Sequence, residues 1–335
     1  MDIKITKKRI LNVLNYEWVK AIAYIVAIIL LWSLLFTSLG TRLTDGQQFY
    51  MVTYEGVYTK SADATVSFLS EMKNGKSGIN GDSVLSYDVY QTKETPISAL
   101  GSYSAINMFD IRLSVNEGDI MVLPDKAVEY NPTDNETLTD FQYFVNNGKL
   151  ESIEKLLSDA YDYTVGNGFI EETDSGYTVN DKKIENYFKD ERIKSARNYR
   201  RTYISDEVIN EGVKNEIKRI ETVYLNYKTV KSGIEKANSV DKGFLTYKTP
   251  SYVTKEGEII SKEEGAYGID LGKLNEGYQD KDVKDLWYVL DEDGNPTEKG
   301  LILAVIELTS VQPELQYESL GVIAYLIRNY SNYAN

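Results

Sequence analysis

The chain has 335 residues and contains neither histidine nor cysteine. Without imidazole and thiol groups it has no Ser-His-Asp triad, no Cys-His pair and no zinc site built from those ligands. The absence of cysteine also excludes disulfides and a lipidated N-terminal cysteine. The phosphate-binding patterns GxxxxGK[ST] and GxGxxG are absent as well. We therefore expect no catalysis, no cofactor and no metal. Glycoside hydrolysis by paired carboxylates remains the open enzyme alternative.

Basic residues are clearly fewer than acidic residues in this sequence. The sequence has 37 basic against 51 acidic residues, which gives a net charge of −14. Such a surface repels nucleic acid and anionic lipid headgroups, so we expect neither as a partner of the folded part. A hydrophobic content of 42% and 27 tyrosines favour a folded domain over a disordered stalk.

One long uncharged run, AIAYIVAIILLWSLLFTSL, occupies residues 21–39. As a helix it would extend about 28 Å, close to the ~30 Å hydrocarbon thickness of a bilayer. Basic residues gather on its N-terminal side, which predicts a cytoplasmic N-terminus. We expect a cytoplasmic basic tail at residues 1–20, a transmembrane helix at 21–39 inserted in the bilayer of the cell membrane, a linker at 40–48 and an extracytoplasmic remainder.

The alternative for this run is a cleaved secretory signal. Signals of that kind have a shorter apolar centre and a small-residue cleavage site. The end of the run and the segment that follows it, TSLGTRLTDGQQF, offer no good A-x-A-like site. The sequence therefore favours a retained, single-pass anchor.

Alternating strand and helix patterns follow the linker. Strands are predicted at residues 49–58, 84–91 and 119–123, and helices at 65–73, 97–115 and 141–157. The last of these helices is predicted to be interrupted by an Asn-Gly break and to resume for a turn or two. The order indicates an α/β sheet with right-handed crossovers, and the wholly apolar run at 119–123 is typical of a parallel strand covered on both faces. We divide the remainder into an α/β lobe at 49–157, a helical second lobe or insertion at 158–264, and returning strands with a C-terminal helix at 265–335.

Several runs carry a family resemblance. They are EGDIMVLPD at residues 117–125, FQYFVNNGKL at 141–150, YGIDL at 267–271, LILAVIE at 301–307 and LQYESLGVIAYLIRNY at 315–330. Together they resemble the extracytoplasmic solute-binding proteins of ABC importers, and within them the sugar-binding group of the type II periplasmic-binding fold. The chain departs from that family in keeping a helical anchor and in its helical middle region.

The resemblance implies a two-lobed α/β fold whose ligand lies in a cleft beyond the carboxyl ends of the strands. The ligand-binding residues it implies follow three predicted strands, with an aromatic pair from the second lobe. They are Tyr54, Glu55, Tyr90, Gln91, Pro124, Asp125, Trp287 and Tyr288. Tyrosine abundance suits saccharide recognition, and equally an ordinary strand-rich surface.

The middle region predicts a long helix at residues 205–239, with Ser205 as its N-cap. Its apolar residues recur at helical spacing and form a seam: Ile209, Val213, Ile217, Ile220, Tyr224, Tyr227 and Ile234. The seam either packs within its own domain or receives another protein.

Upstream lies a basic block of Lys182, Lys183, Lys189, Arg192, Lys194, Arg197, Arg200 and Arg201. We interpret the block as a solvated helix face paired with Glu185, Asp190 and Glu191; the alternative is a docking site for an acidic partner.

Residues 291–295 (DEDGN) have oxygen ligands but not the full spacing of a calcium loop, so we expect a turn there and likewise at residues 80–82. The function we expect is a membrane-anchored, saccharide-binding module that serves a membrane transporter. The alternative is a non-catalytic envelope scaffold that keeps the fold and binds another protein through its helical region.

Overall fold

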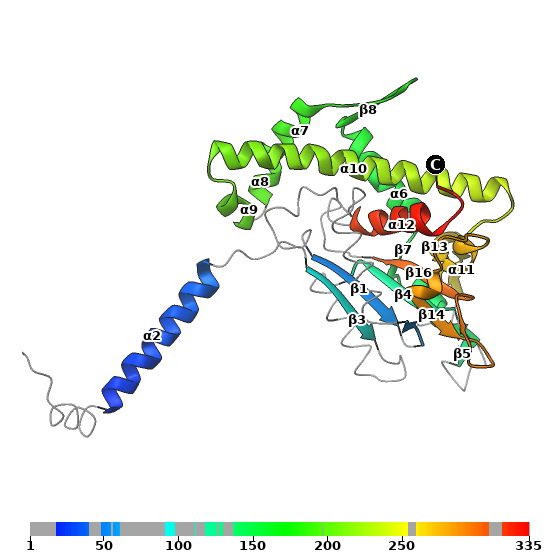
Figure 1. Cartoon of the computed structure of the whole chain (residues 1–335), viewed down its shortest axis with the longest axis horizontal. Coiled ribbons are helices and arrows are strands. Elements are labelled where there is room, and N and C mark those ends of the chain that lie inside the picture. The colour runs from blue at the N-terminus through cyan, green and yellow to red at the C-terminus, as the bar shows by residue number, and fades with distance from the viewer. Residues whose placement is uncertain are drawn as a thin grey trace, which may run out of the picture. The chain divides into compact units, whose positions relative to one another are not determined.

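The computed structural model describes most of the chain (Figure 1). The described residues are 18–39, 48–54, 56–60, 91–97, 111, 118–125, 127–129, 137–195, 197–253, 259–307 and 317–334. The chain divides into two compact units, Met1–Arg42 and Leu43–Asn335. The predicted helix at 65–73, the strand at 84–90, the turn at 80–82 and nearly all of the helix at 97–115 lie outside the described residues.

The first unit contains the apolar helix α2 (Trp18–Leu39), drawn in blue in Figure 1. It has 22 residues and begins three positions before the predicted run. The described residues contain one helix that is long enough and apolar enough to cross a membrane, and that helix is α2. An N-terminal signal sequence would meet the same criteria of length and composition.

The second unit is built on a mixed sheet of seven strands. Six of them follow one another in the order β10–β13–β16–β4–β1–β3, and β7 pairs with β16. Their bounds are β1 Gln48–Tyr54, β3 Gln91–Ile97, β4 Ile120–Pro124, β7 Leu150–Glu151, β10 Leu245–Lys248, β13 Gly265–Asp270 and β16 Leu301–Ile306. Strands β3, β1 and β4 are parallel, whereas β16, β13, β10 and β7 join the sheet antiparallel. The fold is therefore mixed α/β, and β4 is the border between its two halves.

At the central strands β4 and β16 both faces of the sheet are buried, as the apolar run at 119–123 predicted. In β4, Ile120 and Val122 belong to one core cluster and Met121 and Leu123 to the other. Residues of β16 alternate in the same way because successive side chains of a strand point to opposite faces. The first cluster includes α12 (Tyr317–Tyr330) and α6 (Ile153–Tyr161), and the second includes α5 (Asp140–Asn146).

Four smaller sheets surround the central one. They are β5 (Ala127–Glu129) with β6 (Thr137–Thr139), β8 (Ile170–Thr173) with β9 (Gly176–Val179), β11 (Ser251–Val253) with β12 (Ile259–Ser261), and β14 (Trp287–Leu290) with β15 (Pro296–Thr297) and β2 (Tyr58–Thr59). The turn at 291–295 connects β14 to β15. In it the Oδ1 of Asp291 accepts from the backbone N–H groups of Asp293 (3.0 Å) and Asn295 (2.7 Å), as expected of a turn.

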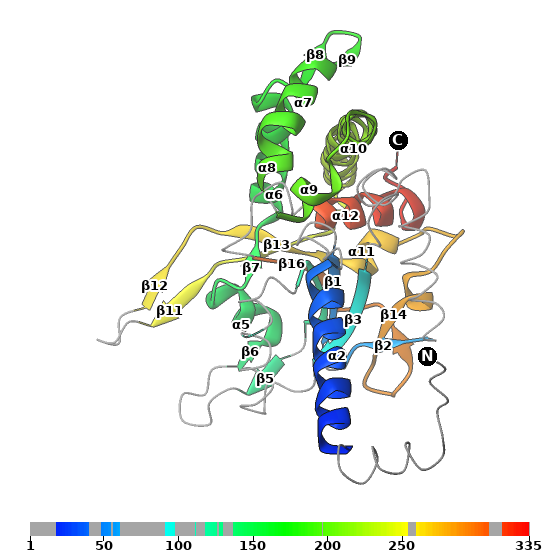
Figure 2. The same cartoon turned by 90° about the vertical axis from the view of Figure 1, so that its left-hand side faces the viewer.

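The middle region consists mainly of helices, and two of its turns are π-helical. After α6 come η2 (Asp162–Gly166), α7 (Asp181–Tyr187), η3 (Phe188–Arg192), α8 (Ile193–Ser195), α9 (Arg197–Thr202) and α10 (Asp206–Ser239). Figure 2 shows α10 nearly end-on, with α6, α7 and α8 alongside it. The Asn-Gly break predicted within residues 141–157 is confirmed: α5 ends before Asn147 and Gly148, and the chain inserts β7 before α6.

Helix α10 matches its prediction closely. Ser205 caps it, since its side chain accepts a hydrogen bond from the N–H of Val208. The seam residues Val213, Ile220, Tyr224 and Tyr227 are buried in the first core cluster. Figure 1 shows α12 between α10 and the sheet, so the seam packs within its own unit.

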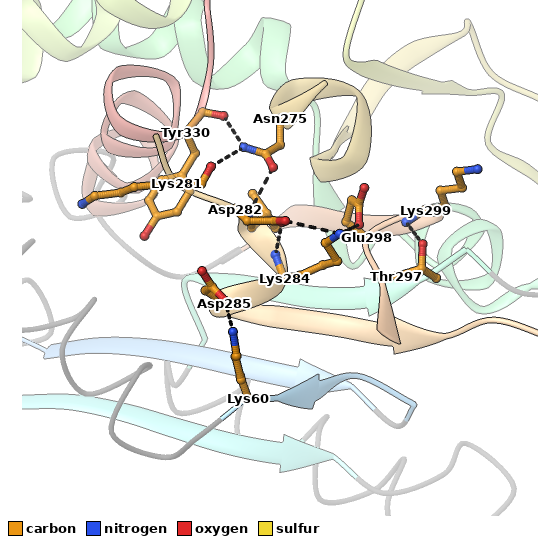
Figure 3. Close-up of polar contacts among 11 residues, drawn as sticks. Lys60, Asn275, Lys281, Asp282, Lys284, Asp285, Thr297, Glu298, Lys299 and Tyr330 are labelled. Carbon is orange, nitrogen blue, oxygen red and sulfur yellow. Dashed lines mark hydrogen bonds and ion pairs between the residues drawn. The ribbon is translucent and has the colours of Figure 1, made fainter. Parts of the chain in front are cut away.

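A polar cluster connects α11 (Leu271–Asn275) and the short 3-10 turn η4 (Val283–Asp285) to the C-terminal helix (Figure 3). The amide of Asn275 donates to the carbonyls of Lys281 (3.0 Å) and Tyr330 (2.9 Å), and its Oδ1 accepts from the N–H of Val283 (3.2 Å). Lys60, beside β2, pairs with Asp285. The amide of one buried residue thus fixes the loop that leads into β14.

Gly212 sets how closely η3 approaches α10. A Cβ at this position would lie 2.6 Å from the Cζ of Phe188 and 2.5 Å from the Cε1 of Tyr203. Both atoms belong to buried or half-buried rings that face each other edge-on. Any larger side chain must push η3 away from the helix.

We therefore expect Gly212→Ala to destabilise the full-length protein by about 1–3 kcal/mol, as overpacking does. Urea unfolding in detergent micelles measures the change. The control is Asn210→Ala on the exposed side of the same helix, which should be neutral or stabilise slightly. A gain of about 1 kcal/mol for Gly212→Ala, typical of an unconstrained helical glycine, would contradict the close contact.

Candidate functional site

The predicted cleft residues at the ends of β1 and β4 lie together, but they are packed. Tyr54 is 3% exposed, and its ring meets that of Phe144 edge-on at 5.7 Å. Pro124 is buried. Asp125 donates its N–H to the carbonyl of Gly300 (2.7 Å), and its carboxylate lies 3.6 Å from the Nζ of Lys248. This end of the sheet is occupied by the protein's own side chains.

Gln91 lies at the other end of the sheet from Tyr54. The prediction placed Gln91 after a strand, whereas in the structure it begins β3, opposite Gln48 at the start of β1. The residue opposite Tyr54 is Ile97. The prediction was misled because the polar sequence of β3, QTKETPI, suits an edge strand and lacks the apolar pattern of a buried one. Glu55 and Tyr90 lie outside the described residues.

Trp287 and Tyr288 belong to β14, which pairs with β2 and not with any strand of the middle region. Trp287 is 0% exposed and contributes to the core. Tyr288 stacks on Tyr58, with ring centroids 5.6 Å apart. Because β2 follows β1 directly along the chain, the pairing of β14 with β2 brings Trp287 and Tyr288 beside β2.

A cavity lies in the helical middle region, away from the ends of β1 and β4. Its volume is about 820 Å³. Aromatic rings, amides and charged groups line it: Tyr163, Gly166, Asn167, Phe169, Lys183, Asn186, Tyr187, Asp190, Glu191, Arg192 and Ser195. None of these residues was among the predicted ligand-binding set.

Both π-helical turns contribute to the cavity wall. Tyr163 and Gly166 come from η2, and three consecutive residues that end at Arg192 come from η3. A π-turn inserts an extra residue into a helix, so it redirects the side chains that follow; such turns are rare and often occur at functional sites. Here each π-turn directly follows an α-helix, and the two meet at one cavity.

A buried group of charges lies beneath the cavity. Arg192 is 4% exposed, Glu216 3% and Arg219 1%. Arg219 donates to both carboxylate oxygens of Glu216, from Nε at 3.0 Å and from an Nη at 2.8 Å. The Nε of Arg192 is 3.9 Å from the same carboxylate. Arg219 also donates to the hydroxyl of Tyr163.

The charges change the ionisation of their neighbours. Burial alone would raise the pKa of Glu216, but the positive charges of Arg219 and Arg192 outweigh it and hold that pKa below its usual value. Burial raises the pKa of Tyr163 to about 12, against the opposing charge of Arg219. Near pH 7, therefore, Glu216 is ionised and Tyr163 is neutral.

The basic block divides into two kinds of residue. Lys189 pairs with Glu185 at 2.5 Å and Lys194 with Asp190 at 3.3 Å, both four residues apart on exposed helix, as predicted. Arg192 does not belong to a solvated face, since it is buried against α10. The signal that could have identified its partner is Glu216, which stands three residues after Val213 and four before Ile220, at a core position of the seam.

No group of acidic residues in the described ranges could hold a metal ion. Comparison with protein-family models, with curated proteins and with solved structures gives no match to this chain.

We expect Glu216→Gln to destabilise the protein by about 3–5 kcal/mol, because two buried guanidinium groups would lose their counter-charge. Urea unfolding of the full-length protein measures the loss. The matched control is Glu211→Gln on the exposed side of α10, which should change stability by less than about 0.5 kcal/mol. Equal effects of the two substitutions would refute the ion-pair assignment.

The ion pair of Glu216 with Arg219 makes the stability of the folded protein depend on pH in the acid range. A carboxyl whose pKa is lower in the folded than in the unfolded state contributes stability above the unfolded value, here 4.5, and loses that contribution as pH falls through the folded pKa. The wild type should therefore melt at a higher temperature than Glu216→Gln at pH 5, and this difference should shrink as the pH is lowered further. A constant difference over that range would contradict a depressed pKa.

Proposed function

We propose that this protein is a membrane-anchored, extracytoplasmic binding module for a small polar solute, with saccharides as the expected class. The observation that carries the proposal is the cavity of about 820 Å³ in the helical middle region. That volume lies within the range of small-ligand sites. Its wall combines aromatic faces with amide and charged groups, the combination that packs on sugar rings and hydrogen-bonds sugar hydroxyls.

Hydrogen bonds and ring contacts within the protein fix the cavity wall without the help of a ligand. Asn167 donates its side-chain amide to the carbonyl of Tyr163 (3.1 Å), which fixes the turn after η2. Asn180 caps α7 by accepting from the N–H of Lys183 (3.1 Å). The rings of Phe169 and Tyr187 lie 5.1 Å apart. Pre-organisation of this kind favours binding because less conformational entropy is lost.

The site we propose differs from the one that the family resemblance implies. The ends of β1 and β4 are filled by Phe144 and Lys248, whereas the cavity is open to a ligand. In this proposal the sheet corresponds to the first lobe of a binding protein, and the helical region supplies the binding residues in place of a second α/β lobe.

We further propose that α2 is a retained anchor with a cytoplasmic N-terminus, which keeps the module beside a membrane transporter. Tethering raises the effective concentration of the module near such a partner. The scaffold alternative keeps less support, because the α10 seam that motivated it packs on α12 within the same unit.

Thermal unfolding of the full-length protein in detergent, with a panel of neutral and acidic mono- and oligosaccharides at millimolar concentration, tests binding. At ten times Kd a ligand should raise the melting temperature by about 3 °C. Asn186→Ala, at an exposed position of the cavity wall, should reduce that shift, and Asn210→Ala on α10 should leave it unchanged. If no member of the panel gives a shift, the proposal is refuted.

Protease treatment of intact cells tests the anchor and its orientation. We expect the second unit to be digested from outside, while a tag placed before residue 18 stays protected until lysis. Recovery of the second unit intact from shaved cells, with digestion only after lysis, would place it in the cytoplasm. Release of the whole second unit into the medium would show instead that α2 is a cleaved signal.

A further inference from the structure

We infer that the ligand of the cavity is an oligosaccharide that carries both an acidic and an amino group, with Lys183 binding the acidic group and Glu191 the amino group. This inference rests on the proposed function, since it names the ligand class of the same cavity. It is carried by two opposite charges that line one cavity and whose side chains have no partner in the described part of the chain.

Several polar groups of the cavity wall are already engaged within the protein. Asp190 forms an ion pair at 3.3 Å with a lysine outside the wall. The side-chain amide of Asn167 donates to the carbonyl of Tyr163 (3.1 Å), and the hydroxyl of Ser195 donates to a backbone carbonyl (2.7 Å). These contacts hold the wall together, so they define its shape more than its choice of ligand.

Three side chains of the wall differ from these. Within the described ranges, no hydrogen bond or ion pair engages the side chains of Lys183, Asn186 and Glu191, and all three are exposed. An ammonium, an amide and a carboxylate therefore remain for a ligand. The ammonium favours an acidic group and the carboxylate an amino group, while the amide can both donate to and accept from sugar hydroxyls.

The π-turn η3 brings the two charges toward one side of the helix. Helices α7, η3 and α8 follow one another without a break, and Lys183 and Glu191 are eight residues apart in them. In a continuous α-helix the two would lie about 12 Å apart along the axis and differ by about 80° in direction. A π-turn holds more residues per turn, so it turns Glu191 back toward the side of Lys183. Both then line the same cavity without pairing with each other.

The ammonium of Lys183 lies at the η2 side of the cavity. A Cβ on Gly168 would lie 3.0 Å from the Nζ of Lys183. Gly168 has a φ of 65°, a left-handed conformation that glycine adopts without strain. The side chain of Lys183 thus reaches from α7 to the turn that follows η2. This places a positive charge at one end of the cavity, and Glu191 of η3 supplies a negative charge further along the same wall.

A ligand with its acidic and amino groups on different sugar rings matches this separation of charge. Asn186 stands between the two charges in the sequence and is placed to bind hydroxyls. The rings of Phe169 and Tyr187, 5.1 Å apart, offer an apolar surface for the face of a sugar ring. A neutral sugar would leave both wall charges without a partner, and a purely acidic or purely basic sugar would leave one.

Four forms of one disaccharide test the inference in the full-length protein in detergent. The parent is glucuronate linked to galactosamine, which carries both charges. Its N-acetyl form lacks the positive charge, its methyl ester lacks the negative charge, and the doubly blocked form is neutral. By titration calorimetry we expect the parent to bind about three- to fivefold more tightly than either singly blocked form, the size expected of a partly exposed ion pair.

Two variants assign each charge to its residue. Lys183→Gln should weaken binding of the parent and of the N-acetyl form about three- to fivefold and leave binding of the methyl ester unchanged. Glu191→Gln should weaken binding of the parent and of the methyl ester and leave the N-acetyl form unchanged. The matched controls are Lys182→Gln and Glu171→Gln, which should change no Kd. All four positions are exposed, and the two controls lie outside the cavity wall.

The possible outcomes separate this inference from the proposed function. Equal affinity of all four forms would overturn the selection for charge and leave saccharide binding in place, as would binding of neutral sugars alone. A loss in Lys183→Gln that is as large for the methyl ester as for the N-acetyl form would overturn the assigned residue. Binding of a three-residue peptide with free termini, but of no sugar, would refute the saccharide class and the inference with it. No binding of any compound would refute both.

Discussion

The packing of α12 between the sheet and α10 is the contact on which the rest of the second unit depends. Twelve of its 14 residues are buried, which is expected only of a helix covered on nearly all sides. Its apolar residues cover β4 and β16 from one side and receive the seam of α10 on the other. The strands described in the middle region form no large sheet of their own, so α10 buries its apolar stripe against α12.

Particular contacts fix the angle and register of that packing. The guanidinium of Arg328 donates to Asn226 (2.8 Å) and to Thr229 (3.0 Å) on α10. One turn further along, a Cβ on Gly233 would come within 3.0 Å of a methyl group of Ile327. A small residue and a directed hydrogen bond therefore hold the two helices at close range, and a sliding of either helix would break both.

The cavity is connected to this core through a tyrosine pair. Tyr163, in the cavity wall, stacks on Tyr317 at the start of α12, with ring centroids 5.0 Å apart. The hydroxyl of Tyr317 donates to the carbonyl of Asp159 (3.1 Å), which places α6 against the same helix. The η2 turn is thus attached to the central helix, while α7 and η3 supply the other residues of the cavity wall and Phe188 of η3 lies against Gly212.

Local patterns made much of the fold predictable, and distant pairings did not. The cap at Ser205 and the apolar strands 120–124 and 301–306 follow from spacing and composition within a short window. The partner of Trp287 is Thr59, more than two hundred residues away, and no window contains both. The edge strand that begins at Gln91 has a polar sequence without the apolar pattern from which a strand is predicted. For these reasons the sequence did not show that Gln91 begins β3 or that β14 pairs with β2.

Arg192 shows the same limit for the site itself. Within residues 182–201 it is one of eight basic residues, and its neighbours in sequence do pair on an exposed face. It differs from them because η3 turns its side chain toward α10, where Glu216 interrupts an otherwise apolar seam. A carboxylate is costly at a core position unless cations reach it, so Glu216 requires Arg219 beside it. Arg192 of η3 approaches the same carboxylate to 3.9 Å and also lines the cavity, so the buried ion pair and the cavity wall share one residue.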